Sequence, residues 1–104
     1  MTEVVEYESE SGKNHFRKWF LVLPAHHADK VVQAIRRMEA GNLGDHKSVG
    51  GGVFEHRIHN PALRVYFGKD GDELVILLAG GSKTRQGQDI VKARELWREY
   101  KENN

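Results

Sequence analysis

Two neighbouring segments that alternate with a two-residue period constrain the fold of this chain most strongly. They lie in the stretch GVFEHRIHNPALRVYF, residues 52–67. In an extended conformation every second side chain points to the same face. The face opposite the more apolar one carries Glu55, Arg57, His59, Arg64 and Tyr66. The pattern predicts two strands, at 53–59 and 64–68, with arginines pointing away from the core.

Further strands are predicted on both sides of this pair. Residues 4–7 form a short candidate strand, and the glycine-rich connection at 41–52 has room for one around 47–49. Asp70-Gly71 is a two-residue hairpin signal. The segment that follows it, 73–79, is apolar on both faces and is expected in the interior of the sheet.

Three helices are predicted from apolar positions at helical spacing. The first is expected to have Ser11 as its N-cap and to stop at Pro24. The second runs from Ala25 to a glycine stop at Gly41, and the third covers about 86–100. The first two helices are expected to form an αα-hairpin on one side of the sheet.

The resulting fold class is α+β, in the order β-α-α-β-β-β-α, with helices packed on one face of a mainly antiparallel sheet. Trp19 and Trp97 lie on the apolar stripes of their helices and are expected to anchor the core. The other face of the sheet is expected to be partly open, with Arg57 and Arg64 pointing into it.

Length and composition support one domain, residues 1–104, with a single core. The chain has no cysteine, no apolar run as long as the ~20 residues of a membrane span and no signal peptide pattern, so a cytoplasmic protein without membrane contact is expected. The four glutamates in residues 1–10 leave the rest of the chain with more basic than acidic groups. That balance fits a polyanionic partner, but it also fits a solvated surface of mixed charge.

Two sharper motifs fail on spacing. LLAGGSKT, residues 77–84, has Ser82 and Leu77 where a phosphate-binding loop needs glycines. His56 and His59 point to opposite faces of a strand, and the adjacent pair His26-His27 cannot chelate from one helix. The sequence therefore predicts no metal site and no cofactor.

The cationic strand face has two interpretations. Arg57, Arg64 and Lys47 either solvate an exposed sheet face or bind the phosphodiester backbone of RNA, with Tyr66 available to stack on a base.

Several segments together resemble one known family. They are the GN-GD-K-VG-GV run at 41–53, the E-R-I and R-V-Y-F strands, the GG-K-Q-DI run at 80–90 and the closing helix. In this combination the chain from Phe16 to Tyr100 resembles the phage-derived HigB-like addiction-module toxins of the RelE/ParE superfamily.

The resemblance implies the toxin of a type II toxin–antitoxin pair, which cuts mRNA on the ribosome and is silenced by a helix-turn-helix antitoxin. It implies attack by the RNA's own 2′-hydroxyl, without a metal. Arg64, followed by Lys83 and Arg57, would then stabilise the charge on phosphorus, and Glu55 or His59 would transfer a proton. Lys47, Tyr66 and Arg85 would contact RNA. Two alternatives stay open: a ParE-like inhibitor of DNA gyrase, and an RNA-binding module without toxicity.

Overall fold

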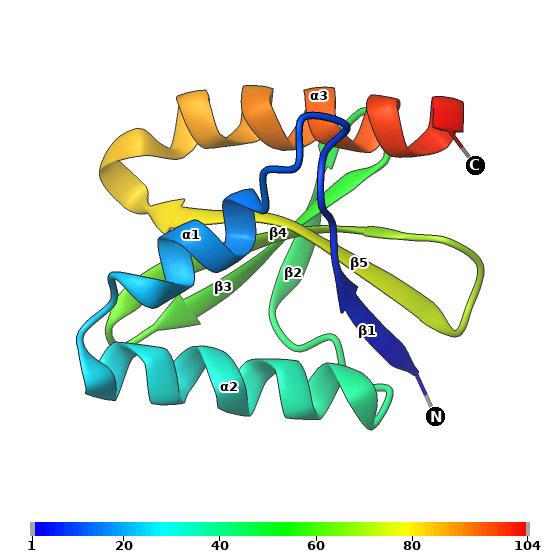
Figure 1. The fold of residues 1–104 in the computed structure, drawn as a ribbon. Helices are drawn as coiled ribbons and strands as arrows, with labels where there is room; N and C mark the ends of the chain where they lie inside the picture. Colours follow the sequence, from blue (N-terminus) through cyan, green and yellow to red (C-terminus); the bar gives the residue numbers. More distant parts are fainter. Residues whose placement is uncertain (1, 104) are drawn as a thin grey trace.

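A computed structural model describes residues 2–103 as a five-stranded sheet with three α-helices (Figure 1). The strands are β1 (Glu3–Glu6), β2 (His46–Gly50), β3 (Val53–His59), β4 (Ala62–Lys69) and β5 (Leu74–Ser82). The helices are α1 (His15–Leu21), α2 (Ala25–Glu39) and α3 (Gln86–Asn103), and a 3₁₀ turn, Lys83–Arg85, precedes the last. The predicted α+β class is confirmed. The predicted order has three strands between the second and third helices, whereas the structure has four. The additional strand is β2, the short segment around 47–49 for which the sequence left room, and it pairs with β3.

The sheet has the strand order β1-β5-β4-β3-β2. The strands β2 to β5 form an antiparallel meander, whereas β1 pairs with β5 in parallel, with Glu3 opposite Leu74. Two helices and three strands therefore lie between β1 and β5 in the sequence, although the two strands are neighbours in the sheet. The predicted strand at the N-terminus is present, shifted by one residue.

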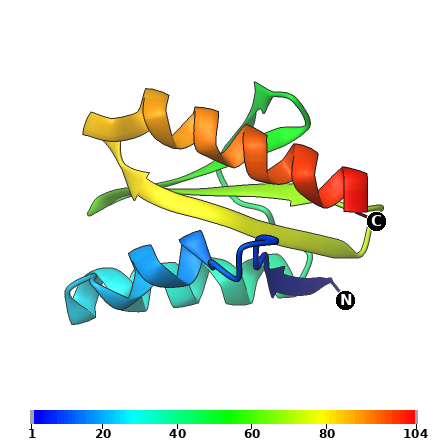
Figure 2. The ribbon, with the colours of Figure 1, turned by 45° about the horizontal axis from the view of Figure 1, so that its top comes forward.

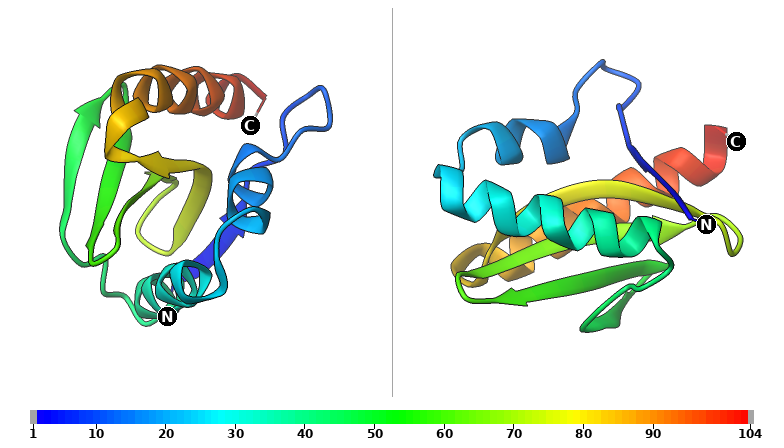
Figure 3. Two further views of the ribbon diagram at one scale, coloured as in Figure 1. Left: turned by 90° about the vertical axis from the view of Figure 1, so that its left-hand side faces the viewer. Right: turned by 90° about the horizontal axis from the view of Figure 1, so that it is seen from below.

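Helices cover both faces of the sheet, so the prediction that they lie on one face is wrong. Figures 2 and 3 show α1 and α2 on one side and α3 on the other. On β5, Val75 and Leu77 belong to the core beneath α1 and α2, whereas Ile76 and Leu78 pack in the core with Trp97 of α3. Because β5 is apolar on both faces, both faces must be shielded from water, and α3 shields the face opposite α1 and α2.

The N-cap of α1 is Asn14, not the predicted Ser11. The Asn14 Oδ1 atom accepts a hydrogen bond from the backbone N–H of Arg17 at 2.8 Å. The Ser11 hydroxyl lies 2.9 Å from that of Ser9 instead, in the turn before the helix. Asn14 is equally good as a cap and lies directly before the first helical residue.

The glycine pair that resembled part of a phosphate-binding loop lies inside β5. A Cβ atom at Gly80 would overlap the ring of Trp19 from α1, and one at Gly81 would overlap the carboxylate of Asp89 from α3. The two glycines thus let side chains from opposite faces approach the strand backbone. Within residues 2–103, no helix is both long and apolar enough to span a bilayer.

Candidate functional site

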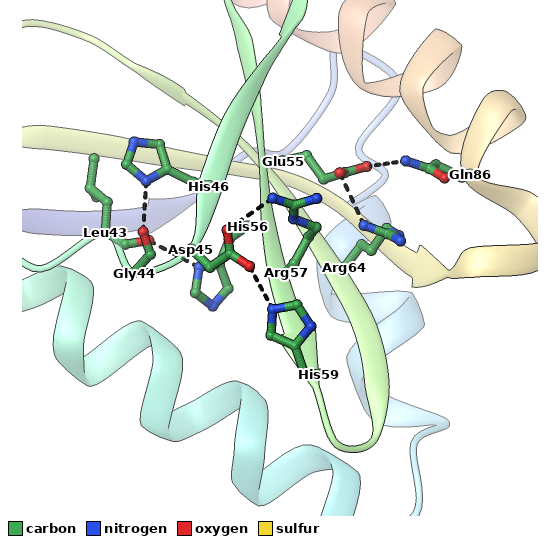
Figure 4. A network of polar contacts seen from close by, with 10 residues as sticks. All are labelled: Leu43, Gly44, Asp45, His46, Glu55, His56, Arg57, His59, Arg64 and Gln86. Atoms are coloured by element: carbon green, nitrogen blue, oxygen red, sulfur yellow. Dashed lines mark hydrogen bonds and ion pairs between the residues drawn. The ribbon is translucent and has the colours of Figure 1, made fainter.

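Arg57 and Arg64 lie directly opposite one another on β3 and β4. Two like charges in register on neighbouring strands repel unless each is compensated. Here each arginine pairs with its own carboxylate, Arg57 with Asp45 and Arg64 with Glu55 (Figure 4). The two strands therefore hold two guanidinium groups side by side, as the alternating pattern predicts.

The Arg64 side chain is held by a buried glutamate. Its Nη1 donates to Oε2 of Glu55 at 3.0 Å, and Gln86 of α3 donates to the other carboxylate oxygen at 2.7 Å. The Tyr66 hydroxyl lies 3.4 Å from that same oxygen. Glu55 has no exposed surface, and the Arg64 side chain is only 15% exposed. The expectation that Arg64 points into an open face is therefore wrong, because α3 lies over Glu55 and Arg64 and its Gln86 bonds to the glutamate.

Burial also changes two of the predicted roles. Tyr66 has no exposed surface, so its ring is not available to stack on a base. Burial raises the pKa of its hydroxyl, with the Glu55 carboxylate acting in the same direction. Glu55 is enclosed by its three partners, so it cannot reach a substrate proton in this arrangement. Both residues instead position Arg64.

Arg57 belongs to a second, more exposed network. Its Nη2 donates to Oδ1 of Asp45 at 2.9 Å, and Nε2 of His59 lies 2.5 Å from Oδ2 of the same carboxylate. The hydrogen bond from His59, followed by that from Arg57, lowers the pKa of Asp45. Because the carboxylate accepts, the proton of a neutral His59 lies on Nε2, and its Nδ1 is left as a base. The His59 side chain is 72% exposed.

Asp45 is a site residue that the strand pattern missed, because it lies in the loop before β2. Its backbone carbonyl also accepts a hydrogen bond from Arg57 N at 2.8 Å, so the loop continues the pairing of β2 with β3 by one residue. Asp45 lies in the GN-GD-K run, directly before the strand that pairs with the strand of Arg57. That position was the signal in the sequence that could have identified Asp45 as a partner of Arg57.

The other predicted cations are exposed. Lys47 of β2 lies in register with Glu55. Lys83 comes directly after Ser82, which pairs with the residue before Arg64. Arg85, in the same turn, donates to the Gln88 side chain at 3.2 Å. These cations surround the Arg57–Arg64 pair at the ends of the neighbouring strands.

Asp89 of α3 is a second residue that sequence reasoning missed. Its Oδ2 atom is buried and has no hydrogen-bond partner within residues 2–103, and burial raises the pKa of its carboxyl, opposed by Arg85. It lies over Gly81, and Gly81 is in register with Arg64. One row across the sheet thus runs from Asp89 through Arg64 and Arg57 to Asp45. The Nε atoms of both arginines are also buried without a partner.

The described residues contain no group of three His, Asp or Glu side chains arranged to hold a metal ion.

Comparison with known proteins places the chain in a family. Residues 18–98 match the family model described as "Phage derived protein Gp49-like". An uncharacterized protein of Haemophilus influenzae is 45% identical over 71 residues, which are 67% of this chain and 72% of the relative. No solved structure matches significantly. The chain therefore belongs to the phage-derived Gp49-like family, which falls in the RelE/toxin-like group.

Proposed function

We propose that this protein is the toxin of a type II toxin–antitoxin pair and that it cleaves mRNA on the ribosome. The observation that carries the proposal is the Arg57–Arg64 pair, fixed on two strands with a histidine–carboxylate pair beside it. Guanidinium groups recognise phosphate oxygens through planar, charge-assisted hydrogen bonds. The toxin-like character of the family supports the same assignment.

In the proposed reaction, the 2′-hydroxyl oxygen attacks the adjacent phosphorus and the bond from phosphorus to the 5′-oxygen breaks. Nδ1 of His59 accepts the proton of the 2′-hydroxyl, while Asp45 holds the imidazole in place. The two arginines stabilise the negative charge that grows on the phosphate oxygens. The products are a 2′,3′-cyclic phosphate and a 5′-hydroxyl.

The leaving 5′-oxygen needs a proton, and Asp89 is the proposed donor. Its raised pKa favours the protonated carboxyl, and it lies at the opposite end of the row from Asp45. Acid and base would thus lie at the two ends of the row that contains the two arginines. Lys47, Lys83 and Arg85 would position the RNA strand.

The decisive experiment adds the purified protein to translating ribosomes and maps the new mRNA ends. We expect cleavage with a cyclic phosphate at the 3′ end. His59→Gln should slow cleavage by roughly 10²–10⁴-fold, the usual contribution of a general base. His26→Gln is the matched control, since His26 is exposed on α2 and its ring packs against that of His27, and this variant should cleave at the normal rate.

Other outcomes would favour the alternatives. DNA breaks that depend on gyrase, without new mRNA ends, would replace the proposal with a ParE-like activity. RNA binding without cleavage would leave only an RNA-binding module.

The proposal also requires an antitoxin, because a free mRNA-cutting toxin stops growth. Co-expression with a neighbouring helix-turn-helix gene should yield a copurifying complex and relieve growth arrest. Growth without a defect when the wild-type chain is expressed alone would contradict the proposed toxicity.

A further inference from the structure

A pocket of about 260 Å³ lies between α2 and the end of β3, next to the Asp45 end of the arginine row. One wall is the side of α2 that carries Lys30, Gln33, Ala34 and Arg37, which are spaced so that they face the same way. The opposite wall includes Arg57 and His59, which also belong to the Asp45 network (Figure 4).

The pocket exists because β2 begins only at His46. The register of β2 with β3 reaches only His46 opposite His56, so the last residues of β3 have the loop at 42–45 beside them in place of a strand. Asn42 fixes that loop by accepting a hydrogen bond from the backbone N–H of Gly44 at 2.9 Å.

His56 anchors the same loop from beneath. Its Nδ1 lies 2.9 Å from the carbonyl oxygen of Leu43, so Nδ1 is the donor. In a neutral ring, Nε2 is then a hydrogen-bond acceptor. Gly44 has a φ of +64°, and a Cβ atom there would come within 2.7 Å of the His56 ring. The glycine thus permits the close approach, and the pocket wall is an ordered part of the fold.

The charge in this pocket is positive. Lys30, Arg37 and Arg57 line it, and Asp45 is the one acidic residue among the described residues of its lining. Both oxygens of Asp45 are already engaged, by Arg57 and His59. Among the described residues, neither Lys30 nor Arg37 forms an ion pair. Two cations therefore line the pocket without a counter-charge.

We propose that this pocket binds a phosphate group, held between Lys30 and Arg37 of α2 and Arg57 of β3. Its volume falls below the roughly 300–1,000 Å³ of sites for drug-sized ligands, and it suits a compact anion. Arginines favour phosphate because a planar guanidinium can donate two parallel hydrogen bonds to it. Gln33 and Asn42 supply amide groups for the remaining oxygens.

The phosphate could belong to RNA or to a free phosphorylated small molecule. The inference does not depend on RNA cleavage, because its first readout is the binding of inorganic phosphate.

The test follows the ring resonances of His56 and His59 by NMR while inorganic phosphate is added to the full chain. We expect saturable shifts that chloride at equal ionic strength does not produce. Arg37→Gln should weaken phosphate binding about ten-fold, the scale of one hydrogen bond to a charged group. Arg36→Gln is the matched control, since this neighbour carries the same charge but lines a different surface of α2, and it should leave binding nearly unchanged.

Equal losses in the Arg36 and Arg37 variants, or shifts that chloride reproduces, would overturn the proposal, as would the absence of saturation. A short 2′-O-methyl RNA, which cannot be cleaved by 2′-hydroxyl attack, then separates the two sources. If it displaces phosphate and depends on Arg37, the pocket takes an RNA phosphate. If phosphate binds and the RNA does not compete, the ligand is a free small phosphate. Either result is independent of whether the wild-type chain cuts mRNA.

Discussion

The two arginines of the site have different surroundings although they lie side by side. Arg64 is mostly buried against a glutamate without exposed surface, whereas Arg57 pairs with a carboxylate that is itself accessible to solvent. Alternation along β3 and β4 correctly placed both on one face. It could not predict their burial, because burial depends on α3, whose Gln86 bonds to Glu55 from a distant part of the chain.

This difference predicts that Arg64→Ala destabilises the fold as well as any activity. The substitution leaves the buried Glu55 carboxylate without its ionic partner, which typically costs about 3–5 kcal/mol. Chemical denaturation of the purified variant measures the loss. Adding Glu55→Gln to Arg64→Ala should recover part of it, because the amide removes the buried charge and its oxygen can still accept from Gln86. A single Arg64→Ala variant as stable as the wild type would contradict the buried pair.

At the scale of elements, every helix and strand was predictable, and their boundaries were less so. The cap of α1 was misplaced because Ser11 and Asn14 are both good capping residues, and the choice depends on where the chain leaves β1. Asn14 also donates to Glu6 of β1 at 2.9 Å, a contact that no local pattern encodes. The sequence correctly excluded a phosphate-binding loop at the glycine pair but ended the strand at residue 79, because the side chains that lie over Gly80 and Gly81, Trp19 and Asp89, are distant in sequence.

The cap assignment predicts that Asn14→Ala lowers the free energy of unfolding by about 0.5–2 kcal/mol, since it removes the side chain that accepts from Arg17 N. Ser11→Ala should have a smaller effect, because among the described residues the Ser11 hydroxyl bonds only to the Ser9 hydroxyl. Thermal melting of the two variants compares them directly. A larger loss of stability in Ser11→Ala than in Asn14→Ala would show that Ser11 is the N-cap, as expected from the sequence.

A second pair of variants tests the packing of α3 on the sheet. A Cβ atom at Gly68 of β4 would overlap the Trp97 ring, so Gly68→Ala should cost about 1–3 kcal/mol through overpacking. Gly87, in the first turn of α3, has open space around it, so Gly87→Ala should stabilise the helix by up to about 1 kcal/mol. Denaturant midpoints report both changes. Equal effects of the two substitutions would mean that α3 does not lie against β4 as described.

At the scale of the whole molecule, the sequence already contained the signal for two covered faces. The segment that became β5 is apolar on both sides, and a sheet with one open face does not need such a strand. The prediction of one covered face came from reading Arg57 and Arg64 as exposed. The structure satisfies both patterns, because α3 covers the sheet with its apolar stripe and reaches the arginine row with Gln86 and Asp89.

Stability should fall as the solution is made mildly acidic. Burial lowers the pKa of His56, so below its unfolded pKa of about 6.5 the unfolded chain takes up a proton that the folded chain resists. The stabilisation is complete above that pH and declines below it. His15 acts in the same direction, whereas the raised pKa of Asp89 opposes it.

Comparing melting temperatures between neutral and mildly acidic pH isolates the contribution of His56. In His56→Asn the amide can still donate to the Leu43 carbonyl, but it does not titrate. We expect this variant to lose less stability on acidification than the wild type. An identical pH dependence would show that His56 is not a determinant of acid sensitivity.

The pairing of β1 with β5 has a consequence for how the chain folds as it is synthesised. Among the described strands, β1 is made first and pairs with β5, which is made last, since Glu3 to Glu6 lie opposite Leu74 to Leu77. Until β5 has emerged, β1 has no partner in the sheet, and contacts so distant in sequence form slowly. The arginine row is completed later still, because Gln86 and Asp89 follow β5. A nascent chain therefore lacks a complete arginine row until the first turns of α3 have been made, and the proposed chemistry cannot begin before then.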